Sequence, residues 1–376
     1  MAVPQGPIRA GRNSNGVCNA ECEDNAIRLF IEGDALFDAM LSDFASARRR
    51  VWLESYIFAD DTIGHEFMKV RSDCSRRGLD VRVRVDALGS KFGFSGGSAR
   101  RLEAAGVRFV WCHPWQWRKP WLFHRRNHRK LAIVDDKAAY LGGFNITGLN
   151  SRRIFGDARW RDTHFRLAGP VVDEARRAFE SFGRGDLKWQ GGGSQGGIEL
   201  LTTHGRACRY RLRCHLKDRF KAARNRLWLT TPYFVPDSGT QRDLCRAASD
   251  GVDVRVLVPG KNDVPLVQWA ARAAYSRLLA SGIRIFEYQP RVLHAKTLIV
   301  DDDWSMVGTA NLDYRSLFIN YELNLAADCQ SLNTALATIF ENDLNESIEV
   351  RREPWSRRPL SARMAEFIGW SARHWL

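Results

Sequence analysis

Two periodicities of hydrophobic positions alternate along this chain, one typical of strands and the other of helices. Short runs rich in β-branched residues, VRVRV at 81–85 and VRVLV at 254–258, predict buried strands. The stretch LFDAMLSDFASARRR at 36–50 predicts an amphipathic helix with arginines at its end. Its apolar face consists of Leu36, Met40, Phe44 and Ala47. Alternating strands and helices of this kind indicate an α/β fold in which helices cover the sheets.

The same order of elements occurs twice. Three pairs of segments are similar between the halves: VWLESYIF (51–58) and LWLTTPYF (227–234), RGLDVRVRVD (77–86) and DGVDVRVLVP (250–259), and AAGVRFVW (104–111) and ASGIRIFEY (280–288). A repeat of this length predicts a duplicated unit, and a pseudo-twofold arrangement is the simplest one for two copies. We therefore expect a shared site where the two halves meet.

Changes in composition mark the expected domain boundaries. The segment KWQGGGSQGGIEL at 188–200 is rich in Gly and polar residues, as flexible linkers are. We divide the chain into a polar tail, a first domain, a Gly-rich linker, a second domain and a basic, Trp-containing C-terminal helix: 1–25, 26–187, 188–197, 198–350 and 351–376. The unusual stretch THGRACRYRLRCHL at 203–216 is where we expect substrate-specific signal.

Each half also carries a His-x-Lys-x4-Asp motif, HRKLAIVD in the first half and HAKTLIVD in the second. In an extended chain, residues two apart point the same way, so each His shares a face with its Lys. The catalytic candidates are the polar residues of the two motifs: His128, Lys130, Asp135, His294, Lys296 and Asp301. Glycines follow each motif, and then Asn145 and Asn311 supply amide donors near the same mouth.

Two imidazoles, two ammonium groups and two amides together suit a tetrahedral anion, and a phosphodiester fits. One neutral His can attack phosphorus, while the other, protonated, donates to the departing oxygen. The two lysines supply the positive charge that a metal would otherwise provide, so we expect neither a metal nor a cofactor. Asp162 and Glu322 are candidates for orienting the imidazoles and raising their basicity.

The charge of the chain predicts an acidic partner. A net charge of +14 suits nucleic acid, an anionic membrane surface or a phosphorylated substrate. No apolar run approaches the ~20 residues needed to cross a bilayer, and the N-terminus lacks the apolar region of a secretory signal. The eight Cys have no zinc-site spacing, so we expect free thiols in a reducing compartment.

A Trp-rich basic segment, WCHPWQWRKPWLFHRR at 111–126, runs directly into the first motif. Trp favours the lipid headgroup zone, and Arg and Lys favour anionic lipids. We take Trp115, Trp117 and Trp121 as membrane-facing candidates. The alternative is that they pack the loop onto its domain, and the same two alternatives hold for the C-terminal helix.

The paired motif resembles the signature of the phospholipase D superfamily. Within it, the chain is similar to bacterial cardiolipin synthases, particularly the short B-type enzymes, over residues 27–350. The matching stretches are FHRRNHRKLAIVDDKAAYLGGFNIT, WRDTHFRLAGPVV, TTPYFVPD and VLHAKTLIVDDDWSMVGTANLDYRSLFINYELNL. The resemblance implies two tandem α-β-α sandwich domains of the phospholipase D type, related by pseudo-twofold symmetry.

The resemblance also implies an activity. A phosphatidyl group passes from one phosphatidylglycerol to the glycerol hydroxyl of another through a phosphohistidine, without metal. An anionic phospholipid membrane is then the partner, and the protein is peripheral on the cytoplasmic face of the bacterial inner membrane. The family pattern favours His128 as nucleophile and His294 as acid and base, with Asp162 and Glu322 orienting them.

Two details of the motifs qualify this picture. The family pattern gives Asp135 and Asp301 more of a role in backbone positioning and Lys contacts than in direct chemistry. Gly143 stands where the second motif has Thr309, so the two half-sites are not equivalent.

Three other functions stay open. A phospholipase D hydrolase would use water as the acceptor, and a nuclease of the same fold would suit the basic charge. A catalytically silent scaffold that binds membrane or nucleic acid is the third. The intact motifs count against the scaffold, and the Trp-rich basic segment counts against the nuclease.

Overall fold

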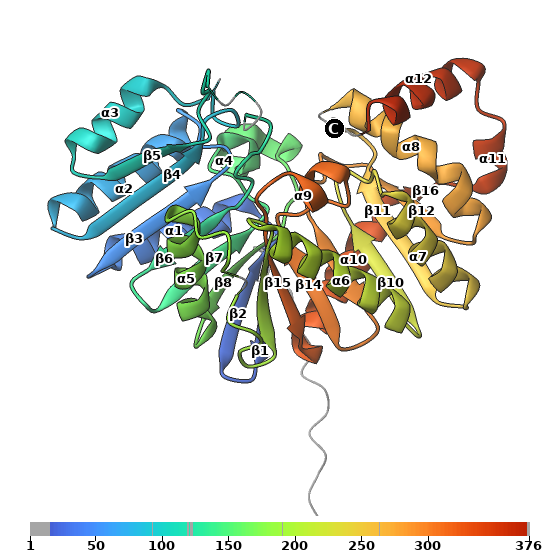
Figure 1. Cartoon of the computed structure of the whole chain (residues 1–376), viewed down its shortest axis with the longest axis horizontal. Helices are drawn as coiled ribbons and strands as arrows, with labels where there is room; N and C mark the ends of the chain where they lie inside the picture. Colours follow the sequence, from blue (N-terminus) through green and yellow to red (C-terminus); the bar gives the residue numbers. More distant parts are fainter. Residues whose placement is uncertain are drawn as a thin grey trace, which may run out of the picture.

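Two eight-stranded sheets, one from each half of the chain, fan out side by side from a common centre (Figure 1). The computed structural model describes residues 16–91, 93–118, 120, 123–189, 191–262 and 264–373. Helices cover the sheets, so the expected α/β fold of two similar units is confirmed.

The first sheet has the strand order β1-β2-β8-β7-β6-β3-β4-β5. Its strands are β1 (Val17–Cys22), β2 (Asn25–Phe30), β3 (Arg50–Ser55), β4 (Asp80–Asp86), β5 (Arg108–Cys112), β6 (Leu131–Val134), β7 (Ala138–Gly142) and β8 (His164–Ala168). The helices of this half are α1 (Gly33–Ser46), α2 (Thr62–Arg76), α3 (Gly96–Ala104), α4 (Arg152–Phe155) and α5 (Val171–Gly183).

The second sheet has the order β16-β12-β11-β10-β13-β14-β15-β9. Its strands are β9 (Ile198–Thr202), β10 (Arg226–Thr230), β11 (Asp253–Pro259), β12 (Arg284–Tyr288), β13 (Thr297–Val300), β14 (Trp304–Gly308), β15 (Leu323–Asp328) and β16 (Ser347–Glu349). The helices are α6 (Arg206–Ala222), α7 (Ser238–Ser249), α8 (Pro265–Ala280), α9 (Tyr314–Phe318), α10 (Gln330–Asn345), α11 (Arg352–Ser356) and α12 (Leu360–Ser371).

The two sheets repeat each other apart from their edge strands β1 and β16. In the first, β3, β4 and β5 are parallel, whereas β6, β7 and β8 are antiparallel to their neighbours. The second sheet has the same pattern, with β10 to β12 parallel and β13 to β15 antiparallel. This equivalence places the two His motifs at corresponding points, each just before β6 or β13.

Three large apolar cores and one small cluster of Val235, Val267 and Ala270 hold the described part of these layers together. One lies between the first sheet and α1 to α3, and a second lies between the second sheet and its outer helices. The third contains residues of both sheets together with α5 and α10, including Leu167, Phe179, Leu325 and Phe340. Because burial of apolar area is the main stabilising term, this shared core fixes the halves against each other.

The predicted amphipathic helix illustrates how the pattern specifies the packing. Helix α1 spans Gly33–Ser46, and Leu36, Met40 and Phe44 are buried on it. Ala47, directly after the helix, is buried as well. These side chains belong to the core beneath the first sheet, so the prediction of this helix and its face is confirmed.

The N-terminal prediction is wrong from Val17 onward. Instead of a polar tail reaching to residue 25, Val17–Cys22 forms β1, which pairs antiparallel with β2. The cysteine prediction is wrong for one pair, because a disulfide joins Cys22 in β1 to Cys329, directly before α10. These residues are 307 positions apart, so their spacing gave no sign of the bond.

The C-terminal segment also differs from the prediction. It forms two helices, α11 and α12, because Pro359 interrupts the pattern and precedes the first residue of α12. Glu366 and Gly369 are the buried residues of α12, which packs on α8 (Figure 1). Its other side leaves Leu360, Met364, Phe367 and Ile368 exposed. Among the described residues, no helix has the length and apolarity to span a membrane.

Candidate active site

Each His motif enters its strand from a loop that binds to the opposite half of the molecule. The backbone N–H of His128 donates to the carbonyl of Tyr321 at 2.9 Å. In the equivalent contact, the N–H of His294 in the second half donates to the carbonyl of Arg161 in the first half at 2.7 Å. Short parallel bridges, Asn127 with Tyr321 and Arg161 with Leu293, continue both contacts. The two motifs are therefore tied together by backbone hydrogen bonds across the seam.

The carboxylates that orient the two imidazoles are exchanged between the halves. Nδ1 of His128 lies 2.9 Å from Glu322 Oε2, and Nδ1 of His294 lies 2.6 Å from Asp162 Oδ2. Glu322 and Asp162 are almost completely buried. In both cases a carboxylate oxygen faces Nδ1, which favours an N–H there and leaves the lone pair of a neutral ring on Nε2. The predicted orienting role of these carboxylates thus has a geometric basis.

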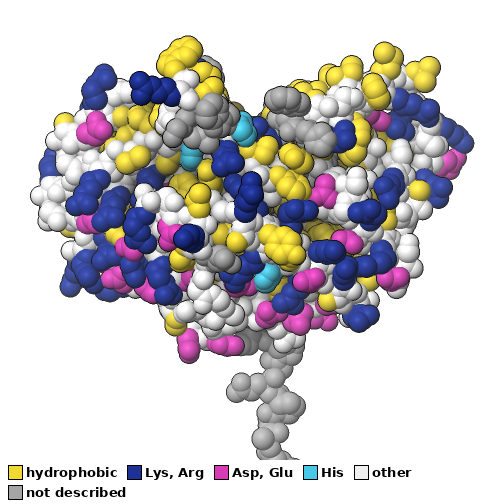
Figure 2. Space-filling model, viewed as in Figure 1, with side chains coloured by type: hydrophobic (Ala, Val, Ile, Leu, Met, Phe, Trp, Pro, Cys, Tyr) yellow, Lys and Arg dark blue, Asp and Glu magenta, His cyan; other side chains and the backbone are white. Residues whose placement is uncertain are grey.

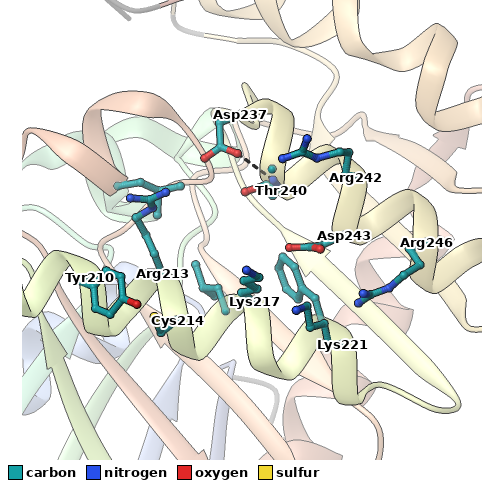
Figure 3. A pocket seen from close by; sticks show the side chains of 14 residues that line it. Tyr210, Arg213, Cys214, Lys217, Lys221, Asp237, Thr240, Arg242, Asp243 and Arg246 are labelled. Carbon is teal, nitrogen blue, oxygen red and sulfur yellow. Dashed lines mark hydrogen bonds between the residues drawn. The ribbon is translucent and has the colours of Figure 1, made fainter.

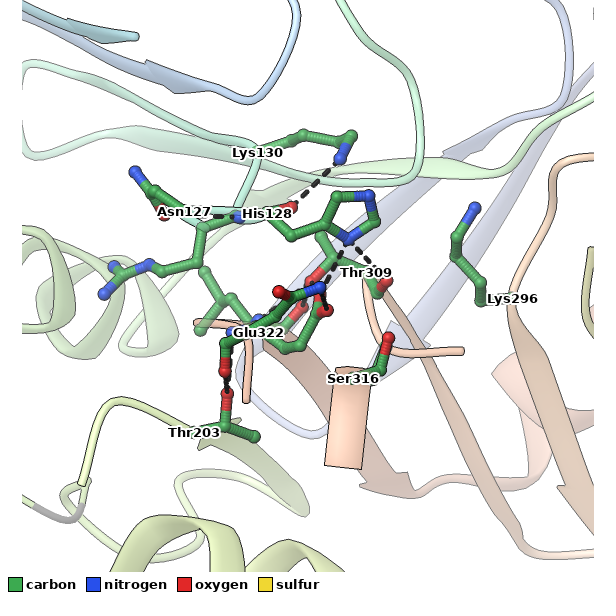
Figure 4. Close-up of polar contacts among 12 residues, drawn as sticks. Asn127, His128, Lys130, Thr203, Lys296, Thr309, Ser316 and Glu322 are labelled. Atoms are coloured by element: carbon green, nitrogen blue, oxygen red, sulfur yellow. Dashed lines mark hydrogen bonds and ion pairs between the residues drawn. The ribbon is translucent and has the colours of Figure 1, made fainter. Parts of the chain in front are cut away.

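The two lysines of the motifs are buried beside the imidazoles. Figure 4 shows Lys130 and Lys296 on either side of the His128 ring, and Lys130 Nζ donates to the carbonyl of His128 at 2.9 Å. Lys296 Nζ lies 2.9 Å from His294 Nδ1. Burial, followed by repulsion from Lys296, lowers the pKa of Lys130 to about 7. The site thus concentrates positive charge that an anion would relieve.

Burial also sets the protonation of the imidazoles. It lowers the pKa of His294 to about 4, helped by Lys296 and opposed by Asp162. It lowers the pKa of His128 as well, and Glu322 partly offsets the effect. Burial acts to raise the pKa of Asp162 and Glu322, but the neighbouring cations bring both below their ordinary values. At neutral pH both imidazoles are neutral and both carboxylates are ionised.

One cavity of about 300 Å³ receives both imidazoles. His128, His294, Asn145 and Asn311 line it together, as the duplicated motif predicts. Asn145 Oδ1 accepts a hydrogen bond from the Ile57 N–H, so the side-chain nitrogen of Asn145 points away from Ile57. Residues from both halves thus surround a space that accommodates a phosphate group but not a whole lipid.

Asp135 and Asp301 lie outside this cavity. The Asp135 carboxylate accepts hydrogen bonds from three successive backbone N–H groups, at Arg48, Arg49 and Arg50. Asp301 does the same with 224, 225 and 226. Both aspartates have positive φ, 51° and 49°. Of their two predicted roles, the structure supports backbone positioning, because each ties the end of its motif strand to the start of the adjacent strand.

Several cavity residues were missed from the sequence. The Tyr56 ring lies 4.9 Å from the His128 ring, and the Trp160 ring lies 5.3 Å from that of His294. Arg126, which also lines the cavity, pairs with the buried Asp86 at 3.4 Å and keeps its Nε and other terminal nitrogen unpaired among the described residues. The basic run before His128 and the Trp two residues before Asp162 were the available signals. The remaining polar residues at the mouth are Tyr233, Asp313, Arg315 and Asn320.

The Trp-rich loop lies beside this site. Trp115 and Trp117 are exposed, the latter to 85%, and their rings contact each other edge to face. Trp121 lies outside the described residues. Trp117 therefore projects into solvent, whereas Trp115 is half-exposed and also packs edge to face on Phe123. Among the described residues, no three His, Cys, Asp or Glu side chains are grouped as metal ligands would be.

This fold and site define a protein built from two phospholipase D-like domains. The family model described as "Cardiolipin synthase, PLD-like domain" matches residues 40–158 and 216–344. The chain is 33% identical to the minor cardiolipin synthase ClsB of Bacillus subtilis (strain 168), covering 93% of this chain and 89% of that protein. It is 30% identical to cardiolipin synthase 1 of Staphylococcus aureus (strain COL), covering 92% and 73%.

The chain belongs to the cardiolipin synthase family. A solved structure supports the fold: phosphatidylserine synthase of Haemophilus influenzae Rd KW20 superposes with a TM-score of 0.71 at 15% identity, over 97% of this chain and 98% of that one. The predicted resemblance to this superfamily and to cardiolipin synthases is therefore confirmed.

Proposed function

We propose that this protein is a phosphatidyltransferase that makes cardiolipin from two phosphatidylglycerol molecules through a phosphohistidine on His128. One observation carries the proposal. His128 and His294 line one cavity, and the orienting carboxylate of each comes from the opposite half of the chain. Two neutral imidazoles with fixed tautomers, flanked by two buried lysines, form a site suited to phosphodiester exchange.

In the first step, Nε2 of His128 attacks phosphorus and the bond from phosphorus to the headgroup oxygen breaks. His294 gives its proton to that oxygen, so glycerol leaves. The hydroxyl of a second phosphatidylglycerol then attacks phosphorus, His294 takes the hydroxyl proton, and the bond to His128 breaks. Two phosphatidylglycerol molecules thus yield one cardiolipin and one glycerol.

The assignment of His128 as nucleophile rests on its hydrogen bonds. Two acceptors, the Thr309 carbonyl at 3.1 Å and Glu322 at 2.9 Å, face its Nδ1, so its lone pair is held at Nε2. His294, with a pKa of about 4 in the free protein, gains its proton when the anionic phosphodiester enters and stabilises the charged form. Because lysines provide the positive charge, we expect full activity in excess chelator.

The cavity volume of about 300 Å³ admits a headgroup while the acyl chains stay outside. This limit supports a peripheral position on an anionic membrane, from which the headgroup reaches the cavity. Exposed apolar side chains cap both lobes of the molecule on either side of the central hollow (Figure 2). The exposed apolar side chains include Trp115 and Trp117 in the first half of the chain, and Leu360, Met364, Phe367 and Ile368 of α12 in the second. Such side chains bind at the lipid interface.

A leaving-group experiment tests the reaction and the order of the histidines. The purified protein, His128→Ala and His294→Ala are given phosphatidylglycerol vesicles and, separately, a phosphatidyl ester of p-nitrophenol, whose leaving group needs no proton. We expect both variants to lose cardiolipin synthesis at least 10³-fold. Only His294→Ala should release a burst of p-nitrophenol and form a phosphatidyl adduct detectable by mass spectrometry.

A burst confined to His128→Ala would reverse the assignment. Phosphatidic acid without cardiolipin would mean that water is the acceptor and that the protein is a hydrolase. Cleavage of DNA without lipid turnover would exclude the proposed function.

The membrane position has its own test. Met364→Ser/Phe367→Ser should weaken binding to phosphatidylglycerol vesicles at least tenfold while leaving turnover of a soluble short-chain substrate unchanged. Ile348→Ser, which alters an exposed side chain on the edge strand β16, is the matched control. Equal vesicle binding by both variants would exclude α12 from the membrane contact.

A further inference from the structure

A groove lined with basic side chains lies between α6 and α7, separate from the catalytic cavity. Its volume is about 480 Å³, larger than the 300 Å³ of the catalytic cavity. The cations on its walls are Arg213, Lys217 and Lys221 on α6 and Arg242 and Arg246 on α7 (Figure 3). Leu216, Phe220 and Leu317 form an apolar floor. The hollow therefore combines positive walls with a surface for an apolar group.

The positive charge of this groove is poorly balanced. Of its two carboxylates, Asp237 is engaged at the start of α7, where it accepts the Thr240 N–H at 2.8 Å. Among the ion pairs between described residues, only Arg246 of the five cations has a partner, Asp250, at 3.9 Å and directly after the same helix. The cations of each helix stand one turn apart, and like charges at that spacing repel each other.

Two basic residues on the other face of α6 differ from those of the groove, because they form ion pairs with the second sheet. Arg211 pairs with Glu199, and Arg219 pairs with Asp328 at 2.8 Å, so these two anchor the helix to its sheet. The corresponding helix of the first half, α1, contains three Asp and neither Lys nor Arg in the sequence GDALFDAMLSDFAS. The duplicated fold therefore does not require a basic helix here, and Arg213 is the groove cation that lies in the unusual stretch at 203–216.

We propose that the groove between α6 and α7 binds a ligand that carries at least two phosphate groups and a small apolar part. Arg213 and Lys221 are two helical turns apart, about 12 Å along α6, a span that suits two phosphates better than one. Arg and Lys recognise phosphate by charge-assisted hydrogen bonds. The ligand is either a soluble bisphosphate or the headgroup region of a lipid with two phosphates, because both present the same chemistry.

The position of the groove relates it to the active site. Leu317 on its floor belongs to α9, and the residue that caps this helix, Asp313, lines the catalytic cavity together with Arg315. One short helix thus separates the two hollows. The proposal itself concerns binding, and it stands whether or not the protein synthesises cardiolipin.

Titration calorimetry with 1,6-hexanediol bisphosphate tests the proposal on the whole chain. We expect Lys217→Gln/Arg242→Gln to weaken binding at least tenfold. Two controls accompany it: Lys69→Gln/Arg277→Gln, which removes the same charges from exposed sites elsewhere, and Lys130→Gln/Lys296→Gln, which alters the catalytic cavity. Binding by both controls should stay within twofold of the unaltered protein. Flotation with cardiolipin-containing vesicles, compared with phosphatidylglycerol vesicles of equal charge, shows which source of the two phosphates the groove accepts.

Loss of binding in the groove variant alone supports the proposal, and the vesicle arm then separates a lipid ligand from a soluble one. Loss only in Lys130→Gln/Lys296→Gln would place the ligand in the catalytic cavity and overturn the proposal. Equally weakened binding in Lys69→Gln/Arg277→Gln would mean that the ligand responds only to the net charge of the protein, and it would overturn the proposal as well. Circular dichroism and thermal melting confirm that each variant is folded.

Discussion

The two halves of the site have the same backbone but differ in how each holds its imidazole. In one half-site, Glu322 accepts hydrogen bonds from His128 and from the Thr309 hydroxyl, the latter at 2.6 Å. In the other, the shorter Asp162 holds His294, and the residue equivalent to Thr309 is Gly143. A methyl group at Gly143 would overlap the Asp162 carboxylate. Asp162 therefore requires a residue without a side chain beside it, Gly143, whereas the longer Glu322 is accompanied by Thr309, which donates a hydrogen bond to it.

This difference explains how a duplicated sequence can give two imidazoles different tasks. His128 faces two acceptors and lies in a fixed tautomer, which suits a nucleophile. Lys296 Nζ lies 2.9 Å from His294 Nδ1, and its charge lowers the pKa of both Asp162 and His294, the latter in addition to the larger effect of burial. A proton held weakly at His294 is readily given to a leaving oxygen and taken back from an incoming one.

Removing the negative charge of either carboxylate is expected to have the largest effect. Glu322→Gln and Asp162→Asn should each lower cardiolipin synthesis on the order of 10²–10³-fold, because each removes the negative charge that stabilises the protonated imidazole and holds the N–H at Nδ1. With the p-nitrophenyl substrate, Glu322→Gln should stay slow while Asp162→Asn recovers. Recovery of both variants with that substrate would show that the half-sites are interchangeable.

Exchanging the small residues should have an intermediate effect. Gly143→Ala places a methyl group against Asp162 and should lower kcat about 100-fold, whereas Thr309→Ala removes one hydroxyl and should cost about 10-fold. The measurement is steady-state turnover of phosphatidylglycerol, with KM recorded separately. A similar small loss in both variants would mean that Gly143 is not needed to accommodate Asp162.

The dependence of kcat/KM on pH should show whether the positive charge of Lys130 is needed for catalysis. Lys130 has a pKa near 7, so it is charged below that pH and neutral above it. If the charge is needed, kcat/KM of the free enzyme falls about tenfold per pH unit above 7. Lys130→Arg should move this alkaline limb upward, because a guanidinium keeps its proton. An unmoved limb in the variant would assign the titration to another group.

Much of this comparison could be predicted from the sequence, because the repeat fixes corresponding positions in both halves. The histidines, lysines and asparagines were identifiable as repeated polar residues, and the orienting carboxylates were proposed as candidates beside them. The exchange of the carboxylates between halves was not, because it depends on how the sheets pack through α5 and α10. The β1 strand and its disulfide were missed for the same reason, since their partners are distant in sequence. Tyr56 and Arg126 have no identical residue at the corresponding position of the second half, so the repeat did not single them out.

The motif aspartates offer the smallest and most discriminating test. Asp135 and Asp301 each bind three backbone N–H groups from a position with positive φ. Asn tolerates this conformation but is a weaker acceptor. Asp135→Asn, in the more buried site, should lower the free energy of unfolding by about 2 kcal/mol, and Asp301→Asn by roughly half of that.

Urea unfolding measures the stability of these two variants, and turnover is normalised to the folded fraction. We expect that normalised turnover to stay within twofold of the unaltered protein, since neither carboxylate reaches the cavity that holds the imidazoles. A loss of turnover comparable to that of His128→Ala, with unchanged unfolding, would instead make these aspartates part of the chemistry. Asp135 and Asp301 would then contribute to catalysis through the strands that they anchor, because those strands position His128 and His294 in the same cavity.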